Sequence, residues 1–229
     1  MKRALLALAL SCAAQDAAAQ PMQPENASDG QAQWLERPQG EDFVRTYPTD
    51  ALAHGLEGRV ALECRVVAGG KAACGVSQEF PPGWGFGRGA LDISPTFRLA
   101  ETLSDGRPAI GAVVRTTISY RQHSREDFGP EIGDATTTVI WRAAPSASDY
   151  ALAQPEGSWA AGGLALLRCV VADDGRFQRC GVVREEPEER GVGAAAMRLS
   201  PGFQVAMDET GLSADDEVAF FISWLGIWP

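Results

Sequence analysis

Apolar and polar side chains alternate along residues 58–67, with apolar groups at positions 60, 62, 64 and 66. A period of two is typical of a β-strand that buries one face. Gly69 and Gly70 follow, and glycine tolerates the positive φ angles of a tight chain reversal. Cys74 and Val76 then resume the same face, so the pattern predicts a β-hairpin.

The same pattern returns about 105 residues later, where residues 163–169 and 180–182 flank a turn at Asp174 and Gly175. Other landmarks recur in the same order and at nearly the same spacing. Trp34 and Pro38 correspond to Trp141 and Pro145, and residues 87–97 correspond to 193–203. The Ile-Ser pair at 118–119 corresponds to the one at 222–223. So many ordered matches rarely arise by chance, and we infer the tandem duplication of a small domain.

Each copy also predicts a helix after the hairpin and a final strand. Residues 90–93 and 196–199 carry the apolar side chains of the helix, and a Ser-Pro pair ends each helix because the residue before proline avoids helical angles. Alternation predicts the last strands over 114–120 and 218–224.

A short first helix is expected after Tyr47 and Pro48, whereas its counterpart after Pro155 is broken by Gly157 and Gly162. These elements predict an α+β fold. It has two tandem domains, each with a three-stranded antiparallel sheet, one or two short helices and a cysteine-bearing hairpin.

The cysteines of each hairpin lie on facing strands and on the same side of the predicted sheet. Folding the strands back brings the sulfur atoms within disulfide reach. We predict the pairs Cys64–Cys74 and Cys169–Cys180, each of which closes a short loop and contributes roughly 2–3 kcal/mol. A thiol oxidoreductase would need a Cys-x-x-Cys pair at a helix N-terminus, so structural disulfides are the favoured interpretation.

The first residues predict export. Lys2 and Arg3 precede an apolar run, and the alanines at 17–19 supply a cleavage site, so residues 1–19 are expected to be a signal peptide. Acylation of Cys12 as a lipoprotein is the less favoured alternative, because Ala9 stands where leucine is usual. The four remaining cysteines suit an oxidising compartment such as the periplasm.

Composition divides the rest of the chain. Residues 20–33 are expected to be a disordered leader, 34–121 the first domain, 122–134 a short charged linker, and 135–229 a degenerate second domain. The 20 basic and 30 acidic side chains give a net charge of −10, which opposes binding to nucleic acid or to anionic membranes. No later stretch is long and apolar enough for a transmembrane segment.

Candidate chemistry is sparse. The only histidines, His54 and His123, have no second metal ligand nearby in sequence, so they are expected at the surface, and no metal, cofactor or catalytic residue is predicted. The acidic cluster at 185–189 is interpreted as a solvated loop rather than a cation site. The glycine-rich run at 83–89 lacks the Lys-Ser/Thr ending of a phosphate-binding loop and is interpreted as the entry to a helix.

The first copy resembles the C-terminal domain of TonB energy transducers, and more narrowly its periplasmic, cysteine-bearing relatives in alphaproteobacteria. The motifs that carry this resemblance are Trp34-x-x-x-Pro38, Tyr47-Pro48, Ala51, Gly55, residues 58–62, Gly70, the run 79–87, Ala90-Leu91, Phe97, and residues 106–108 leading into 113–120. The second copy keeps Pro155, Gly163, both cysteines and Glu185-x-Pro187 but loses the Tyr-Pro pair. The resemblance covers residues 34–121 well and the second copy more weakly.

This resemblance implies a non-enzymatic binding module. In the family, the last strand lies at a sheet edge and accepts an extended peptide of an outer-membrane transporter by strand addition. The corresponding edge here is Val113, Val114, Arg115, Thr116, Thr117, Ile118, Ser119 and Tyr120, and less strongly residues 218–224. For the inward-facing residues, ordinary core packing is the simpler interpretation. Arg115 and Arg121 would also protect such an edge from aggregation.

The chain departs from a TonB transducer because a cleavable signal replaces the membrane anchor and only a stub of linker replaces the Pro-rich spacer. It cannot transmit force by itself. The resemblance leaves open whether it binds a TonB-dependent transporter, braces another envelope protein or competes with a transducer. A structural or inhibitory envelope protein without a transport role is the alternative, and an exposed patch of Trp84 and Phe86, or of Trp224 and Trp228, would favour it.

Overall fold

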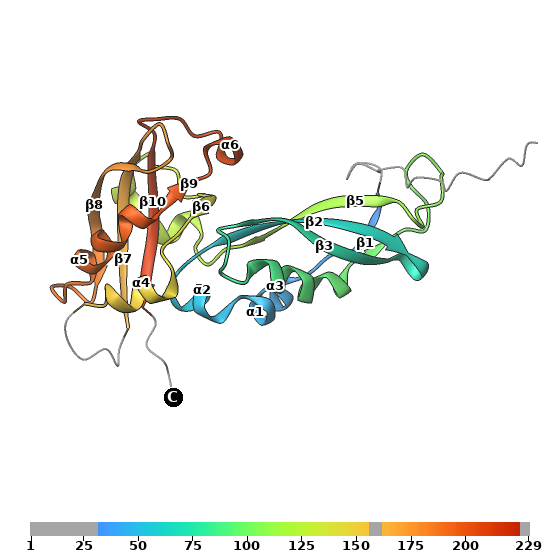
Figure 1. Ribbon diagram of the computed structural model, residues 1–229, viewed down its shortest axis with the longest axis horizontal. Helices are drawn as coiled ribbons and strands as arrows, with labels where there is room; N and C mark the ends of the chain where they lie inside the picture. Colours follow the sequence, from blue (N-terminus) through green and yellow to red (C-terminus); the bar gives the residue numbers. More distant parts are fainter. Residues whose placement is uncertain (1–31, 156–161, 225–229) are drawn as a thin grey trace, which may run out of the picture.

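A computed structural model describes residues 32–155 and 162–224. The predicted signal peptide, Cys12, most of the predicted leader, Gly157 and Trp228 therefore lie outside the described residues. The fold is α+β, and two units of similar construction follow one another along the long axis of the molecule (Figure 1). No helix in the described ranges is long and apolar enough to cross a membrane.

The two units share the order of their strands and of most of their helices, and only α2 and α6 lack a counterpart among the described strands and α-helices. The first contains β1 (Trp34–Glu36), α1 (Gly40–Thr46), α2 (Thr49–Ala53), β2 (Gly58–Val67), β3 (Lys71–Phe80), α3 (Phe86–Ile93), β4 (Arg98–Leu99) and β5 (Val113–Tyr120). The second contains β6 (Trp141–Ala143), α4 (Ala147–Leu152), β7 (Gly163–Val171), β8 (Phe177–Glu186), α5 (Val192–Leu199), β9 (Gln204–Val205), α6 (Met207–Thr210) and β10 (Glu217–Trp224).

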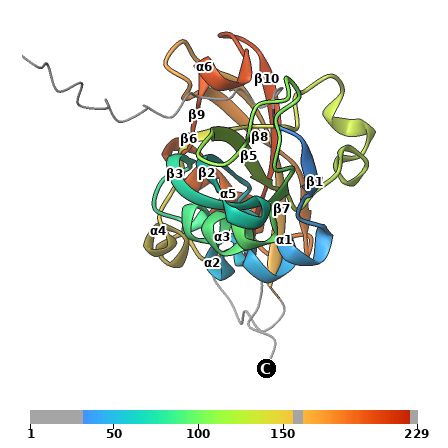
Figure 2. The same cartoon turned by 90° about the vertical axis from the view of Figure 1, so that its right-hand side faces the viewer.

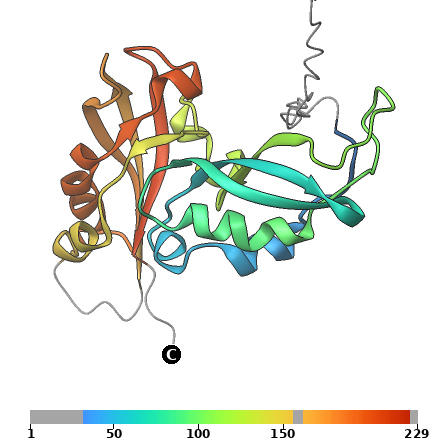
Figure 3. The same cartoon turned by 45° about the vertical axis from the view of Figure 1, so that its right-hand side comes forward.

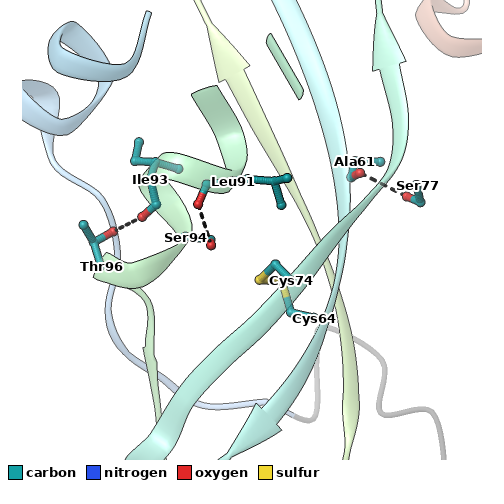
Figure 4. Close-up of a disulfide and its surroundings, with 8 residues drawn as sticks. All are labelled: Ala61, Cys64, Cys74, Ser77, Leu91, Ile93, Ser94 and Thr96. Atoms are coloured by element: carbon teal, nitrogen blue, oxygen red, sulfur yellow. Dashed lines mark hydrogen bonds between the residues drawn. A yellow bond between two sulfur atoms is a disulfide. The ribbon is translucent and has the colours of Figure 1, made fainter. Parts of the chain in front are cut away.

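Both main sheets are antiparallel, with the first strand of the hairpin in the centre. Their orders are β3-β2-β5 and β10-β7-β8. The hairpin cysteines face each other in register, and the predicted disulfides Cys64–Cys74 and Cys169–Cys180 are both present. Figure 4 shows the first bridge on the side of the hairpin that faces the end of α3. The two disulfide-closed hairpins predicted from the alternation are therefore confirmed.

The helices of the first unit lie on one face of its sheet. Figures 2 and 3 show α1, α2 and α3 together below β2, β3 and β5. The side chains of Phe86, Ala90 and Ile93 on α3 are fully buried against the sheet. Burial of this apolar stripe is the main favourable contribution to the packing of the helix on the sheet. One apolar cluster of buried residues continues from this core into the second unit.

The glycine-rich run at 83–89 is the entry to α3, as the sequence indicated. Gly85 is the residue before the helix and has φ 83°, which favours glycine. In the second unit the carboxylate of Glu185 accepts a hydrogen bond from the backbone N–H of Gly193 at the start of α5. The acidic cluster is therefore not wholly a solvated loop, because its first residue satisfies a free N–H of a helix.

Several elements have no counterpart in the sequence prediction. Helices α1 and α4 occupy equivalent positions after the Trp-Pro landmarks, and each unit adds a two-stranded sheet, β1 with β4 and β6 with β9. Strands of two or three residues are too short to produce a readable alternation. The first helix expected after Pro48 is present as α2.

The segment 122–134, expected to be a short linker, is packed against the second sheet. Its two single-turn helices, Arg125–Phe128 and Pro130–Ile132, bury Phe128 and Ile132 against Leu166, Ala219 and Phe221. The guanidinium of Arg125 donates to the carbonyl oxygens of Gly133 and Ala135, which holds the segment in a closed loop. The connection is therefore an ordered layer over the outer face of the second sheet.

Candidate functional site

Strand β5 lies at an edge of the first sheet, where it pairs only with β2 among the described strands. Its inward side chains Val114, Ile118 and Tyr120 are buried in the core, as ordinary packing requires. Its outward side chains at 115, 117 and 119 are exposed. On β5 itself, a partner can therefore contact only the outward side chains and the free backbone edge.

The backbone groups at that edge can be assigned from the ladder. The N–H of Val66 on β2 donates to the carbonyl oxygen of Ala112 at 2.9 Å, and the carbonyl oxygen of Val66 accepts from Gly111 at 2.9 Å. Even-numbered residues of the strand therefore face β2, because hydrogen-bonding direction alternates along an antiparallel strand. The N–H and C=O groups of Val113, Arg115, Thr117 and Ser119 point away from the sheet. No hydrogen bond from another described residue reaches them.

Strand β10 is the equivalent edge of the second sheet, and the chain itself covers it. Thr136 forms a parallel bridge there: its N–H donates to the carbonyl oxygen of Glu217 at 2.8 Å, and its carbonyl oxygen accepts from Ala219 at 2.8 Å. Further along, the N–H of Ser223 donates to the carbonyl oxygen of His54 at 3.2 Å. The second copy therefore does not offer residues 218–224 as a free edge.

The turn that reaches β10 comes from the first unit. Figure 1 shows the end of α2 beside α4, where the two units meet. The imidazole of His54 stacks on Tyr150, with ring centroids 4.1 Å apart, and its Nδ1 donates to the carbonyl oxygen of Ser223 at 3.2 Å. Gly55 follows with φ 68°, and a Cβ there would lie 3.0 Å from the Ser223 hydroxyl oxygen. Glycine thus permits the close approach of the turn to β10.

Both histidines are half-buried at contacts with the second unit, so the expectation that they lie at the surface is wrong. His123 packs against Phe221 with centroids 4.2 Å apart. Burial lowers the pKa of His54, although the Ser223 carbonyl and Asp50 oppose the shift, and burial likewise lowers the pKa of His123 against the effect of Asp127. Burial therefore favours the neutral form of both rings. In the described part of the chain, no three His, Cys, Asp or Glu side chains gather as a metal site would require.

A groove of about 580 Å³ lies on the helix side of the open edge. Phe43 and Val44 of α1, Leu52 of α2, and Ser119 at the end of β5 are among its lining residues, and Val44 is 76% exposed. The full lining is Gly40, Phe43, Val44, Tyr47, Leu52, Ser119, Arg121 and Gln122. The Tyr47 hydroxyl donates to the carbonyl oxygen of Leu56 at 2.9 Å, and burial raises its pKa, so the phenol stays neutral.

The opposite face of β5 is polar. Arg115 forms an ion pair with Glu63 on β2 at 3.2 Å. A smaller hollow of about 250 Å³ lies near the end of the strand, between Thr117 and Ser119 on one side and residues 138–141 on the other. The end of β5 is therefore bordered by an apolar groove on one face of the sheet and a polar hollow on the other.

The alternative contact patch of Trp84 and Phe86 does not exist. Trp84 is 8% exposed and contacts the rings of His54 and Tyr150, and Phe86 is fully buried in the core. Trp224 is also buried, and its indole N–H donates to the carbonyl oxygen of Tyr150 at 3.1 Å. Trp84 therefore joins the two units through Tyr150, and none of these three aromatic residues forms an exposed surface.

Comparisons with protein-family models, with curated proteins and with solved structures found no match.

Proposed function

We propose that this chain is a non-catalytic protein-binding module of the cell envelope. It takes an extended peptide of an envelope partner at the free edge of β5, by strand addition. The module acts in the periplasm, with a TonB-dependent outer-membrane transporter as the partner class that its sequence resemblance implies.

The observation that carries this proposal is the difference between the two sheet edges. The outward N–H and C=O groups of Val113, Arg115, Thr117 and Ser119 have no bonding partner among the described residues, whereas at β10 Thr136 and His54 bond to outward groups of Glu217, Ala219 and Ser223. An open edge is a template for another chain, and proteins usually blunt it unless it is used. Arg115 is paired with Glu63, which leaves its backbone groups accessible.

Two further features support this proposal, one for the compartment and one for the number of binding edges. Each of the two sheets holds a hairpin disulfide, and disulfides persist in oxidising compartments outside the cytoplasm. The contacts of β10 with the rest of the chain support a single binding edge rather than two, so the tandem arrangement adds rigidity and not a second site.

The test is a pull-down of envelope proteins, solubilised from the native cell, on three immobilised forms of the protein. Thr117→Pro removes an outward N–H from β5, and proline is tolerated where that group faces solvent. Val76→Pro is the matched control at the opposite edge: Val76 pairs with Leu62, whose backbone groups face β5, so its own N–H also points outward. We expect wild type and Val76→Pro to recover a TonB-dependent transporter and Thr117→Pro to recover none.

Recovery of no transporter by the wild-type protein, with normal iron and vitamin uptake in a deletion strain, would reject this function. The structural or inhibitory envelope protein would then be the better description. Equal recovery by wild type and by Thr117→Pro would place the binding surface away from β5.

A further inference from the structure

The two units contain the same pair of rings beside their last strands. In the first unit, Phe43 of α1 meets Tyr120 at the end of β5 edge to face, with centroids 5.9 Å apart. In the second, Tyr150 of α4 meets Trp224 at the end of β10 in the same manner and at the same 5.9 Å. Phe43 and Tyr150 stand at equivalent positions after the Trp-Pro landmarks. The geometry thus defines one aromatic platform per unit.

The platform of the second unit is occupied. The imidazole of His54 lies flat on Tyr150 with an interplanar angle of 22°, and Trp84 closes the side, so Tyr150 has no exposed surface. The same residue, His54, bonds through its backbone carbonyl and its ring to Ser223 on the edge of β10. A single residue therefore combines ring stacking with main-chain bonding to the strand edge.

The platform of the first unit is open. Phe43 is half-buried, its neighbour Val44 is exposed, and both line the groove that ends at Ser119. Ser119 is the equivalent of Ser223, and its backbone groups point away from the sheet. The first unit thus repeats two partners of His54, Tyr150 and Ser223, as Phe43 and Ser119, and these line an open groove.

From this correspondence we infer the chemistry of the partner. The peptide that pairs with β5 carries one residue with a planar ring, aromatic or imidazole, which enters the groove and stacks on Phe43 while its main chain bonds to Ser119. The inference rests on the proposed strand addition and specifies which peptides are accepted. The groove volume lies within the range of sites that enclose a small ligand, so it holds such a ring with space for an aliphatic neighbour.

The test begins with a displayed library of random twelve-residue peptides, selected on the mature wild-type protein. We expect the enriched peptides to share a Phe, Tyr, Trp or His at one fixed position. A synthetic copy of the most enriched peptide is then the probe, and its Kd is measured by calorimetry. Replacement of its ring residue by Ser should weaken binding at least about tenfold, because it removes a buried ring contact.

Two matched variants test whether the ring of the bound peptide lies in the groove. Val44→Glu places a charge in the groove at a position that is 76% exposed, so the fold tolerates it. Leu152→Glu makes the same change at an 86% exposed residue of α4, the equivalent helix of the second unit. We expect Val44→Glu to raise the Kd at least about tenfold and Leu152→Glu to leave it unchanged.

The outcomes separate this inference from the function on which it rests. Peptides that lose binding with Thr117→Pro, yet show no ring preference and tolerate Val44→Glu, would overturn the ring site and leave strand addition intact. Peptides that bind equally well to Thr117→Pro would overturn both, and so would a library from which nothing is enriched.

Discussion

The edge strands β5 and β10 occupy the same place in two sheets of the same order, yet one edge is open and the other is covered. The equivalents of Arg115 and Thr117 in the second unit are Ala219 and Phe221. This change makes the outer face of the second sheet apolar, and Phe128 and Ile132 of the connecting segment cover it. One edge thus forms part of an internal joint, while the other has a polar, open face.

The sharpest way to test this comparison is to remove the equivalent rings. Tyr150→Ala should lower the free energy of unfolding by about 3–5 kcal/mol, because the ring is fully buried beneath His54 and its loss leaves a cavity. Phe43→Ala should cost about 1–2 kcal/mol, since the ring is only half-buried beside the groove. Denaturant unfolding followed by circular dichroism measures both. Equal costs would mean that the two platforms are equally covered.

Opening the disulfides should affect the two units alike. The bridges span 10 and 11 residues, so the paired variants Cys64→Ala/Cys74→Ala and Cys169→Ala/Cys180→Ala should each lose roughly 2–3 kcal/mol. Thermal unfolding of both variants under non-reducing conditions provides the comparison. A loss confined to one unit would show that the hairpins do not contribute equally.

Mild acid should loosen the joint between the units. The folded-state pKa of His54 is depressed by burial, so the stability from its neutral ring is present above the unfolded pKa of about 6.5 and is lost as pH falls below it. His123 adds a change of the same sign. His54→Phe keeps the stacked ring without a titrating group, and we expect it to reduce the drop in stability between about pH 7 and pH 5. A drop as steep as in wild type would contradict this role.

The smallest effect is expected at the polar face of β5. Arg115→Ala breaks the ion pair with Glu63, but both side chains are largely exposed, so the free energy of unfolding should change by less than about 0.5 kcal/mol. The same unfolding measurement detects it. A loss above about 1 kcal/mol would indicate that the Arg115–Glu63 pair stabilises the sheet more than an exposed ion pair usually does.

Local patterns predicted much of this fold. The hairpins, both disulfides, helix α3 and the last strands follow from alternation, turn residues and Ser-Pro stops. The packed connecting segment did not follow from these signals, because its polar composition hides the spacing of Phe128 and Ile132. One signal was available: residues 218–222 form a continuous apolar run, whereas the strand 113–120 has polar side chains at 115, 117 and 119. Such a run is typical of a strand that is buried on both faces.

The candidate site was predictable only in outline. The strand 113–120 was singled out through a family resemblance, and its edge position follows from the sheet order. The role of His54 was not predictable, because its partners Tyr150 and Ser223 are far away in sequence. Contacts of this kind depend on how two separately patterned units dock, which periodicity within either unit does not encode.

The packing of Phe128 and Ile132 sets where the chain can be divided. Although residues 122–134 precede β6, their apolar side chains belong to the second sheet, and Thr136 completes its edge. A fragment starting at residue 135 would keep Thr136 but would expose the apolar face that Phe128 and Ile132 cover, and we expect it to aggregate. A division of the chain just after Tyr120 keeps this segment with the sheet that it covers, but it still separates His54 from Tyr150 and Ser223.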